Sequence, residues 1–527
     1  MSYDQAKQIN LSEKRWVFSW WYVDNVQTMD MAPYFSPYLR NARIDGSSII
    51  IRPWHQLHAT LTAWTTPKGI GSYQRANPSN DVMVVRHDQS WTEKIVTVTS
   101  WWTVTPITTT GLIASSNKMS FTNTGDVIYC MNGSDNYGKL SWTTYSTPTT
   151  GITNFAPSYG VTFNKSHFVS WWSTNSNIVY KSVANNYEDF ASTWSDQFKF
   201  DEQVTWLSTN SEALFYFTKN TISVTGINDI TESSTWVFYT NRQLQVKEWA
   251  VNHYSIVEAG NNIYYLTPSN SINKLARGNN IYWFETQDLT ERSNAGITKI
   301  LSTLDSDQSW SFWYFLPWPN LIKWYLKSNG STFNDVCIVL DVIKDVFLID
   351  WQQYYYDWIA FKWSTYTISA LEAKIYRDEY SQDDEWTPIP FEYWTNEFYL
   401  TENKSQKKIL RESWTQLDVN ELAILTQDIY IDGQSVDSKT IYWTDIVSSS
   451  WWIATWSIWE YAIWEEWEES LIDSDYYETY IPRTKWCLNK KWKKIQRRFT
   501  NSSLAGKVRL KNLIPTIEVL PLIATSI

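Results

Sequence analysis

The stretch VFLIDWQQYYYDWIAFKWSTY, residues 346 to 366, decides the fold class. It contains three short runs of β-branched and aromatic residues, and a tryptophan follows each run, at Trp351, Trp358 and Trp363. Read with glycine at these three positions, each run is a strand closed by a residue that tolerates a positive φ. Read as written, the stretch is a run of aromatic residues prone to aggregation. The glycine reading predicts strands joined by tight turns.

The same substitution pattern extends over the whole chain, which has 35 tryptophans and only 16 glycines. Glycine averages about 7% of residues, which would be roughly 37 here. Many tryptophans stand in small, polar settings typical of turns. The doublets Trp20-Trp21, Trp101-Trp102, Trp171-Trp172 and Trp451-Trp452 each follow a serine. We interpret most of these positions as UGA codons that the source organism reads as glycine.

Energetics favour this interpretation, because a side chain forced to positive φ costs roughly 1–2 kcal/mol. If a third of the 35 tryptophan positions need a positive φ, the total strain is on the order of 12–24 kcal/mol. This strain equals or exceeds the roughly 5–15 kcal/mol net stability of a typical domain. Trp324 and Trp394 lie inside strand-like runs with aromatic neighbours and are interpreted as genuine. The alternative is a truly tryptophan-rich protein, such as a glycan binder with aromatic stacking platforms.

Strand signals dominate the rest of the chain and recur at intervals of about 45 residues between Lys68 and Arg377. Examples are the runs that begin at Val82, Asp126, Ala213, Asn262 and Asp335. Four strands in each such interval are typical of a β-propeller. We therefore predict an all-β fold, a β-propeller of six or seven blades with an additional C-terminal β-rich domain. A pair of stacked β-sandwiches is the alternative.

The predicted domains are residues 1–67, an N-terminal β segment; residues 68–377, the propeller; and residues 378–527, the C-terminal β-rich domain. The acidic run at Asp383 and the prolines Pro388 and Pro390 mark the second boundary. Within the last domain, residues 402–421 mix Lys, Gln and Leu as in a short helix. With glycine restored, residues 451–467 form a flexible loop.

The formal net charge of −11 is unevenly distributed. Residues 459–480 are strongly acidic and residues 483–511 strongly basic. Such blocks indicate a solvated face or, alternatively, contact with a neighbouring subunit or with passing DNA. The cysteines Cys130, Cys337 and Cys487 are too few and too widely spaced to predict a disulfide framework or a zinc site. No apolar signal region and no apolar run of membrane-spanning length occurs, so we expect synthesis in the cytoplasm and no membrane span.

The sequence offers no constellation for chemistry. The histidines His55, His58, His87, His167 and His253 are scattered, and His55 and His58 are expected on different faces of an extended segment. No nucleophile elbow, phosphate loop, dinucleotide fingerprint or zinc-protease motif occurs, with or without the glycine reading. We predict no catalytic, cofactor-binding or metal-binding residues, no cofactor and no enzymatic activity.

With glycine restored, the N-terminal region carries a more specific pattern. It has a glycine-rich start near Trp20, an Asn-x-Arg segment followed by a short turn, and an Arg-Pro-Gly strand. The positions that carry it are Asn41, Arg43, Gly46, Arg52, Pro53 and Trp54 (as Gly). This region resembles the opening of bacteriophage head-to-tail proteins, the tail-nozzle or packaged-DNA-stabilisation proteins of short-tailed phages. The resemblance is clearest in the first 60 or so residues.

This resemblance implies a virion structural protein of the tail or neck, assembled as a homo-oligomeric ring around the DNA channel. The implied partners are further copies of this chain, a portal or adaptor protein, distal tail proteins and passing double-stranded DNA bound without sequence specificity. Subunit contacts are expected from Arg40 and Arg43, from the acidic block, and from the basic block that includes Lys490, Lys491, Lys493 and Lys494. The alternatives are a glycan-binding adhesin and a tail-associated polysaccharide hydrolase.

Overall fold

The computed structural model describes residues 38–45, 48–61, 65–75 and 77–381 with short internal gaps. It also describes residues 8–10, 16–17, 21–22, 35–36, 391–394, 408–419, 424–431, 434–442, 477–480, 495–501 and 508–519. Strands account for nearly all regular structure in these residues. The chain is all-β, as predicted.

Seven four-stranded antiparallel units follow one another in the described part of the chain. The first four blades are β9 (Thr65–Tyr73), β10 (Val82–Gln89), β11 (Thr92–Val98) and β12 (Val104–Pro106); β13 (Ser120–Asn123), β14 (Ile128–Met131), β15 (Gly138–Ser141) and β16 (Thr144–Ser146); β17 (Pro157–Phe163), β18 (Ser166–Trp171), β19 (Ile178–Lys181) and β20 (Asp196–Lys199); β21 (Val204–Thr209), β22 (Ala213–Thr218), β23 (Ile222–Gly226) and β26 (Arg242–Leu244).

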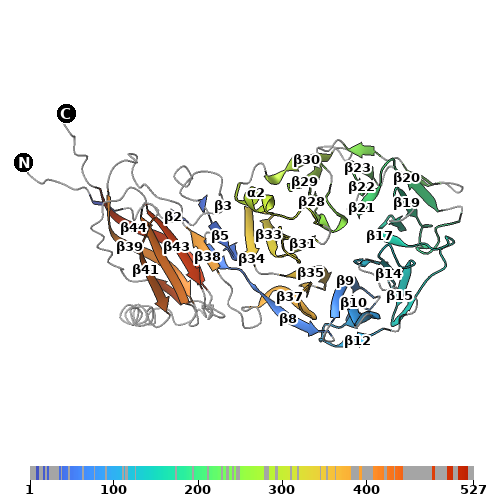
Figure 1. The fold of residues 1–527 in the computed structure, drawn as a ribbon, viewed down its shortest axis with the longest axis horizontal. Coiled ribbons are helices and arrows are strands. Elements are labelled where there is room, and N and C mark those ends of the chain that lie inside the picture. The colour runs from blue at the N-terminus through green and yellow to red at the C-terminus, as the bar shows by residue number, and fades with distance from the viewer. Residues whose placement is uncertain are drawn as a thin grey trace, which may run out of the picture.

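The last three blades are β27 (Ile256–Ala259), β28 (Asn262–Leu266), β29 (Ile272–Arg277) and β30 (Phe284–Asp288); β31 (Phe312–Leu316), β32 (Leu321–Leu326), β33 (Val336–Asp341) and β34 (Val346–Trp351); β35 (Tyr355–Phe361), β36 (Ser364–Ser369), β37 (Lys374–Ser381) and β8 (Trp54–Thr60). The innermost strand of each blade contacts that of the next, and β35 contacts β9. The blades therefore close into a β-propeller, visible as the ring of strands in Figure 1.

The apolar runs singled out in the sequence are second or third strands of their blades, with a paired strand on each side. Every residue of β14, β22 and β33 is buried, because neighbouring blades cover both faces of such a strand. A strand covered on both faces is apolar at consecutive positions rather than at alternate ones. The recurring runs therefore mark one blade each, and the propeller prediction is confirmed.

A strand from the N-terminal region closes the ring. β8 pairs antiparallel with β37 and supplies the outermost strand of the seventh blade. Residues 54–60, assigned from sequence to a separate N-terminal segment, thus belong to the propeller. Closure by a strand remote in sequence joins the two ends of the blade array without any covalent link.

The sixth blade continues outward into the C-terminal region. Its outer strand β34 meets β5 (Tyr38–Arg40) in a short parallel pairing, and the sheet goes on through β38 (Phe391–Trp394), β43 (Ile495–Asn501), β40 (Ile424–Ile431) and β41 (Gln434–Tyr442). A second sheet has the order β42 (Tyr477–Tyr480), β39 (Lys408–Val419), β44 (Val508–Val519), β7 (Ser48–Ile51) and β6 (Ala42–Asp45). Figure 1 shows these strands beside the propeller, with β5 between the two parts.

Short elements complete the description. β1 (Gln8–Asn10) and β2 (Trp16–Val17) pair with β44, β3 (Trp21–Tyr22) pairs with β4 (Phe35–Ser36), and β24 (Ile230–Glu232) pairs with β25 (Val237–Tyr239). The helix α2 (Ala295–Ser302) packs Ile297 and Leu301, one turn apart, into the largest hydrophobic cluster.

Two local predictions are wrong. The short helix expected at residues 402–421 is instead the strand β39, which pairs with β44 along its whole length, so tertiary pairing overrides the helical propensity of its residues. The turn expected at Trp358 is absent, because Trp358 lies inside β35 opposite Thr367. Trp351 is the last residue of β34, where it pairs with Val336.

Candidate functional site

The residues of the N-terminal pattern meet where β6 and β8 lie against the sixth and seventh blades. Asn41 joins β5 to β6 with a positive φ of 51°, which asparagine tolerates better than most residues. Its N–H donates to the carbonyl of Ile349 at 2.8 Å, and its own carbonyl accepts from the N–H of Arg52 at 2.9 Å. Asn41 therefore ties β6 and β7 to the outer strand of the sixth blade.

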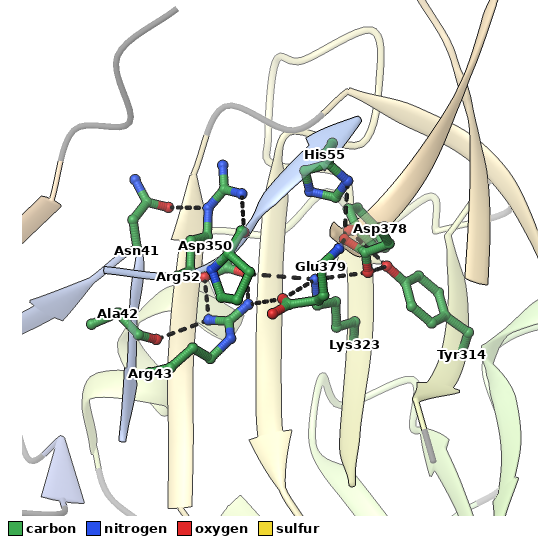
Figure 2. Close-up of polar contacts among 12 residues, drawn as sticks. Asn41, Ala42, Arg43, Arg52, His55, Tyr314, Lys323, Asp350, Asp378 and Glu379 are labelled. Carbon is green, nitrogen blue, oxygen red and sulfur yellow. Dashed lines mark hydrogen bonds and ion pairs between the residues drawn. The ribbon is translucent and has the colours of Figure 1, made fainter. Parts of the chain in front are cut away.

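Arg43 is the centre of a buried ionic junction (Figure 2). Its guanidinium donates two hydrogen bonds to the carboxylate of Asp350, at 2.9 and 2.7 Å. A third contact reaches Glu379 of the seventh blade. A bidentate guanidinium–carboxylate pair is among the stronger polar contacts in proteins. This one joins residues 307 positions apart in sequence.

Lys323 forms the second half of the junction. Its ammonium lies 2.8 Å from Asp378 and 2.6 Å from Glu379. Asp378 is also contacted by His55 Nδ1 at 2.9 Å and by the hydroxyl of Tyr314. Strands from the N-terminal region, the sixth blade and the seventh blade thus share one set of charges, as Figure 2 shows.

A backbone irregularity lets two consecutive carboxylates enter the same cluster. Neighbouring residues of a regular strand face opposite sides of the sheet. The pairing of β37 with β8 shifts register between Arg377 and Ser381, and Glu379 has a φ of 50°. This bulge turns Asp378 and Glu379 toward the same cations.

The electrostatics of the junction favour the charged forms. Burial disfavours the charge of Asp378, but the ammonium of Lys323 and the imidazole of His55 outweigh it, so the pKa of Asp378 lies well below its usual value. Burial likewise opposes the charge of Arg43, yet Asp350 and Glu379 hold the pKa of Arg43 above its usual value. The pKa of Lys323 is also raised, because nearby carboxylates outweigh its burial. Opposite charges in the junction therefore compensate each other's desolvation.

The arrangement holds parts of the chain together rather than presenting a reactive group. The side chains of Arg43, Lys323, Asp350 and Asp378 are almost completely buried. Among the described residues, no group of three or more His, Cys, Asp or Glu side chains is placed to hold a metal ion. We therefore assign this site a positioning role.

A second buried ion pair lies at the propeller axis. The ammonium of Lys118, just before β13, is 2.7 Å from Asp357 of β35. It also lies 3.8 Å from the ring centroid of Tyr254, which precedes β27, and 5.2 Å from that of Phe312 in β31. Asp357 in turn accepts from the N–H of Ile70 in β9, at 3.2 Å. Side chains from four blades and a backbone N–H from a fifth meet here, so this pair lies at the centre of the ring.

The structure brings four residues of the N-terminal pattern together at the junction: Asn41, Arg43, Arg52 and Pro53. Arg52 Nε donates to Asn41 Oδ1 at 3.3 Å, and Arg52 also reaches the carbonyl of Pro53. Trp54 begins β8. Gly46 and the basic residues Lys490, Lys491, Lys493 and Lys494 lie outside the described residues, as do residues 451–467.

The remaining candidates are placed as follows. His55 contacts Asp378, whereas His58 lies 3.2 Å from the carbonyl of Thr99, so the two histidines do face different neighbours. Cys130 and Cys337 are buried free thiols. Cys487 and most of the acidic block lie outside the described residues.

Sequence reasoning missed the partners of the pattern, Lys323, Asp350 and Asp378. One signal for Lys323 was present: a lysine inside the otherwise apolar run Leu321–Leu326, whose residues are all buried. A buried lysine requires a carboxylate partner. The sequence does not show which carboxylate that is.

Comparisons with known proteins support no closer assignment. No protein family and no curated protein matches the chain in sequence. Solved structures with a similar arrangement include YCF48 from Cyanidioschyzon merolae (TM-score 0.39, 9% identity, covering 62% of this chain and 98% of that one) and BamB from Moraxella catarrhalis (TM-score 0.36, 8% identity, 64% and 92%). The WD40 β-propeller domain of Doa1 is similar to the same degree (TM-score 0.37, 9% identity, 62% and 96%). No described helix has the length and apolar character needed to cross a bilayer.

Proposed function

We propose that this protein is a structural component of a bacteriophage tail or neck, a nozzle or DNA-stabilisation subunit that assembles with copies of itself into a ring around the DNA channel. The observation that carries the proposal is the convergence of Asn41, Arg43 and Arg52 on one buried junction. These are the residues on which the resemblance to head-to-tail proteins rests.

The junction supports this role because it unites the two halves of the chain. Arg43 lies on a strand of the second sheet and contacts the sixth and seventh blades. The sixth blade also continues through β5 into the C-terminal strands. A subunit built in this way can transmit load between its propeller and its C-terminal sheets through paired strands and buried ion pairs, as a channel wall requires.

The buried Lys118–Asp357 pair supports a channel between subunits rather than through one propeller. Lys118, Asp357 and the rings around them fill the centre of the propeller. In the proposed ring, duplex DNA passes between subunits rather than through a single propeller. The net charge of −11 suits such a channel, since an acidic wall lets DNA slide instead of binding it.

The proposed source, a genome in which UGA encodes glycine, is supported by two turns. Trp102 and Trp142 have φ angles of 70° and 56°, a region that bulky residues rarely adopt and glycine adopts freely. Trp142 stands in the two-residue turn between β15 and β16, where hairpins favour glycine or asparagine. Trp394 behaves differently, because its indole N–H donates to Glu392 and its ring stacks on Tyr430.

One observation favours the second candidate function, a glycan-binding adhesin. Trp101, Trp102 and Trp142 are 86%, 63% and 57% exposed, as stacking platforms for sugars would be. Peptide mass spectrometry of the protein from its native source separates the two candidates, since tryptophan and glycine differ greatly in mass. Tryptophan at these three positions would favour the adhesin, and glycine would remove its binding platforms.

The ring is tested by producing the chain with glycine at its UGA positions and measuring its mass by native mass spectrometry. We expect a closed oligomer of one size. Changing Lys490, Lys491, Lys493 and Lys494 to glutamate should weaken it if the basic block forms subunit contacts. The matched control changes the exposed Lys165, Lys199, Lys219 and Lys362 in the same way. Monomers in the unchanged protein contradict the proposal.

A further inference from the structure

A cavity of about 380 Å³ lies where the last blade meets the first. Its lining residues come from the end of β8 and from β10, β11 and β12: Thr60, Leu61, His87, Lys94, Val96, Val104 and Pro106. Figure 1 shows the end of β8 beside β12, at the seam where the ring closes. Cavities that bind small molecules commonly have volumes of roughly 300–1,000 Å³.

His87 is the unusual residue of this cavity. The residue is 1% exposed, and among the described residues neither Nδ1 nor Nε2 makes a hydrogen bond of good geometry; its one polar contact is with the backbone of the adjacent Asp88. The other buried histidines each have a more distant partner: His55 contacts Asp378, His58 contacts Thr99, and Nδ1 of His167 lies 2.6 Å from the hydroxyl of Tyr137. A buried polar group without a partner costs about 1–3 kcal/mol. Such a cost calls for a ligand or ordered water.

The charge of the cavity is positive. The register of β10 and β11 places Lys94 directly opposite His87, so the two side chains share one face of the first blade. The neighbouring acid Glu93 contacts Lys68 and Arg86, and it is not a lining residue. Among the described residues, the lining therefore offers an ammonium, an imidazole and the hydroxyl of Thr60 and includes no carboxylate, while Glu93 and Asp88 lie near His87 outside the lining.

The remaining walls are apolar. Leu61, Val96, Val104 and Pro106 enclose the space around these polar groups. One ammonium neutralises one negative charge, whereas a phosphate dianion would remain under-compensated among apolar walls. The site thus fits a monoanion joined to a small hydrocarbon body.

We propose that this cavity binds a small carboxylate with a branched apolar body, its carboxylate between Lys94 and His87 and its hydrocarbon against Leu61, Val96 and Val104. Such a ligand fills the seam between the seventh and first blades, so its binding stabilises the closed ring of blades. The site is separate from the ionic junction and independent of the proposed virion role.

The probe is 4-methylpentanoate, tested by isothermal titration calorimetry and by its effect on the melting temperature of the full chain. We expect saturable binding and a rise in melting temperature that grows with ligand concentration. The neutral isostere 4-methylpentan-1-ol and inorganic phosphate should each bind at least ten-fold more weakly. Tighter binding of phosphate would overturn the assignment to a carboxylate.

Two variants test the residues. K94M and H87L should each weaken binding of 4-methylpentanoate at least ten-fold, while K199M, the same change at an exposed lysine of the third blade, should leave it unchanged. If H87L does not fold, K94M against K199M decides alone. Equal binding by K94M and K199M, or no saturable binding by the unchanged protein, overturns the proposal, as does a structure at saturating ligand that shows only water beside His87.

Discussion

The junction and the axial pair are two answers to the same physical problem, a lysine buried in a β-propeller. Lys323 lies 2.8 Å from Asp378, and Lys118 lies 2.7 Å from Asp357, so the primary contacts are alike. Their pKa values nevertheless move in opposite directions. Burial lowers the pKa of Lys118 and raises that of Asp357, and each partner offsets burial only in part.

The number of opposite charges explains the difference. Lys323 lies 2.6 Å from Glu379 in addition to its contact with Asp378, and Arg43 contacts Glu379 and a third carboxylate, Asp350. Lys118 has one carboxylate and otherwise aromatic rings around it. A buried pair alone is weakly favourable at best, whereas a matched network retains its charges. The propeller therefore depends more on its junction than on its axial pair.

The largest effect is expected from R43M, which leaves Asp350 and Glu379 in a buried site without their guanidinium. Removing one partner of a buried ion pair costs about 3–5 kcal/mol. We expect a loss of this size in the free energy of unfolding, measured by urea denaturation. R43K, which keeps the charge but loses the bidentate contact with Asp350, should lose less. Equal stability of R43M and the unchanged protein contradicts a central role for Arg43.

A smaller effect is expected from K118M at the axis. Because the pKa of Asp357 is already raised, that carboxyl takes up a proton more easily once its partner is gone. We expect a loss of about 1–3 kcal/mol in urea denaturation. The double variant K118M/D357L should recover part of it, since apolar replacement of a buried pair is often neutral. If K118M costs more than R43M, the contrast between the two regions is wrong.

The pH dependence separates the two carboxyl groups by sign. The pKa of Asp378 is lowered on folding, so its contribution to stability is present above its unfolded pKa of about 4 and is lost as the pH falls below that value. The pKa of Asp357 is raised, so its contribution is present at low pH and is lost as the pH rises through the folded pKa.

Stability is measured by urea denaturation between about pH 3 and pH 7. Relative to the unchanged protein, D378N should become less destabilising as the pH falls. D357N should become more destabilising over the same range. Parallel curves for the two variants would show that their environments do not differ as described.

The smallest effects concern the turns. W102G and W142G should each raise stability by about 0.5–1 kcal/mol, because relief of positive-φ strain exceeds the entropy that glycine loses on folding. The control is W324G, which removes a fully buried indole and should destabilise by about 3–5 kcal/mol. Destabilisation by W102G and W142G in thermal melts would argue that these turns accommodate tryptophan.

The sequence predicts the blades well because each is a local unit. Strands such as β22 and β28 are recognisable from their own residues, and hairpins join them to their neighbours. Closure by β8 is not recognisable in this way, since the strand it pairs with, β37, lies beyond six other blades. For the same reason the pattern around Arg43 is visible in the sequence while its partner Asp350 is not.

The misplaced helix has a related cause. The residues of β39 have good helical propensity, and only pairing with β44, near the end of the chain, makes them a strand. The turn predicted at Trp358 is absent because this residue pairs with Thr367 of β36, in a strand that continues to Phe361. Long-range partners, which periodicity does not report, decide both cases.

We propose that the junction around Arg43 holds the propeller and the C-terminal sheets together as one rigid subunit of a ring. Electron cryomicroscopy of the full chain with glycine at its UGA positions tests this most directly. We expect a closed ring with a central channel between subunits. The Arg43–Asp350 contact should be intact in every copy. Single subunits whose propeller and C-terminal sheets take variable relative positions would contradict it.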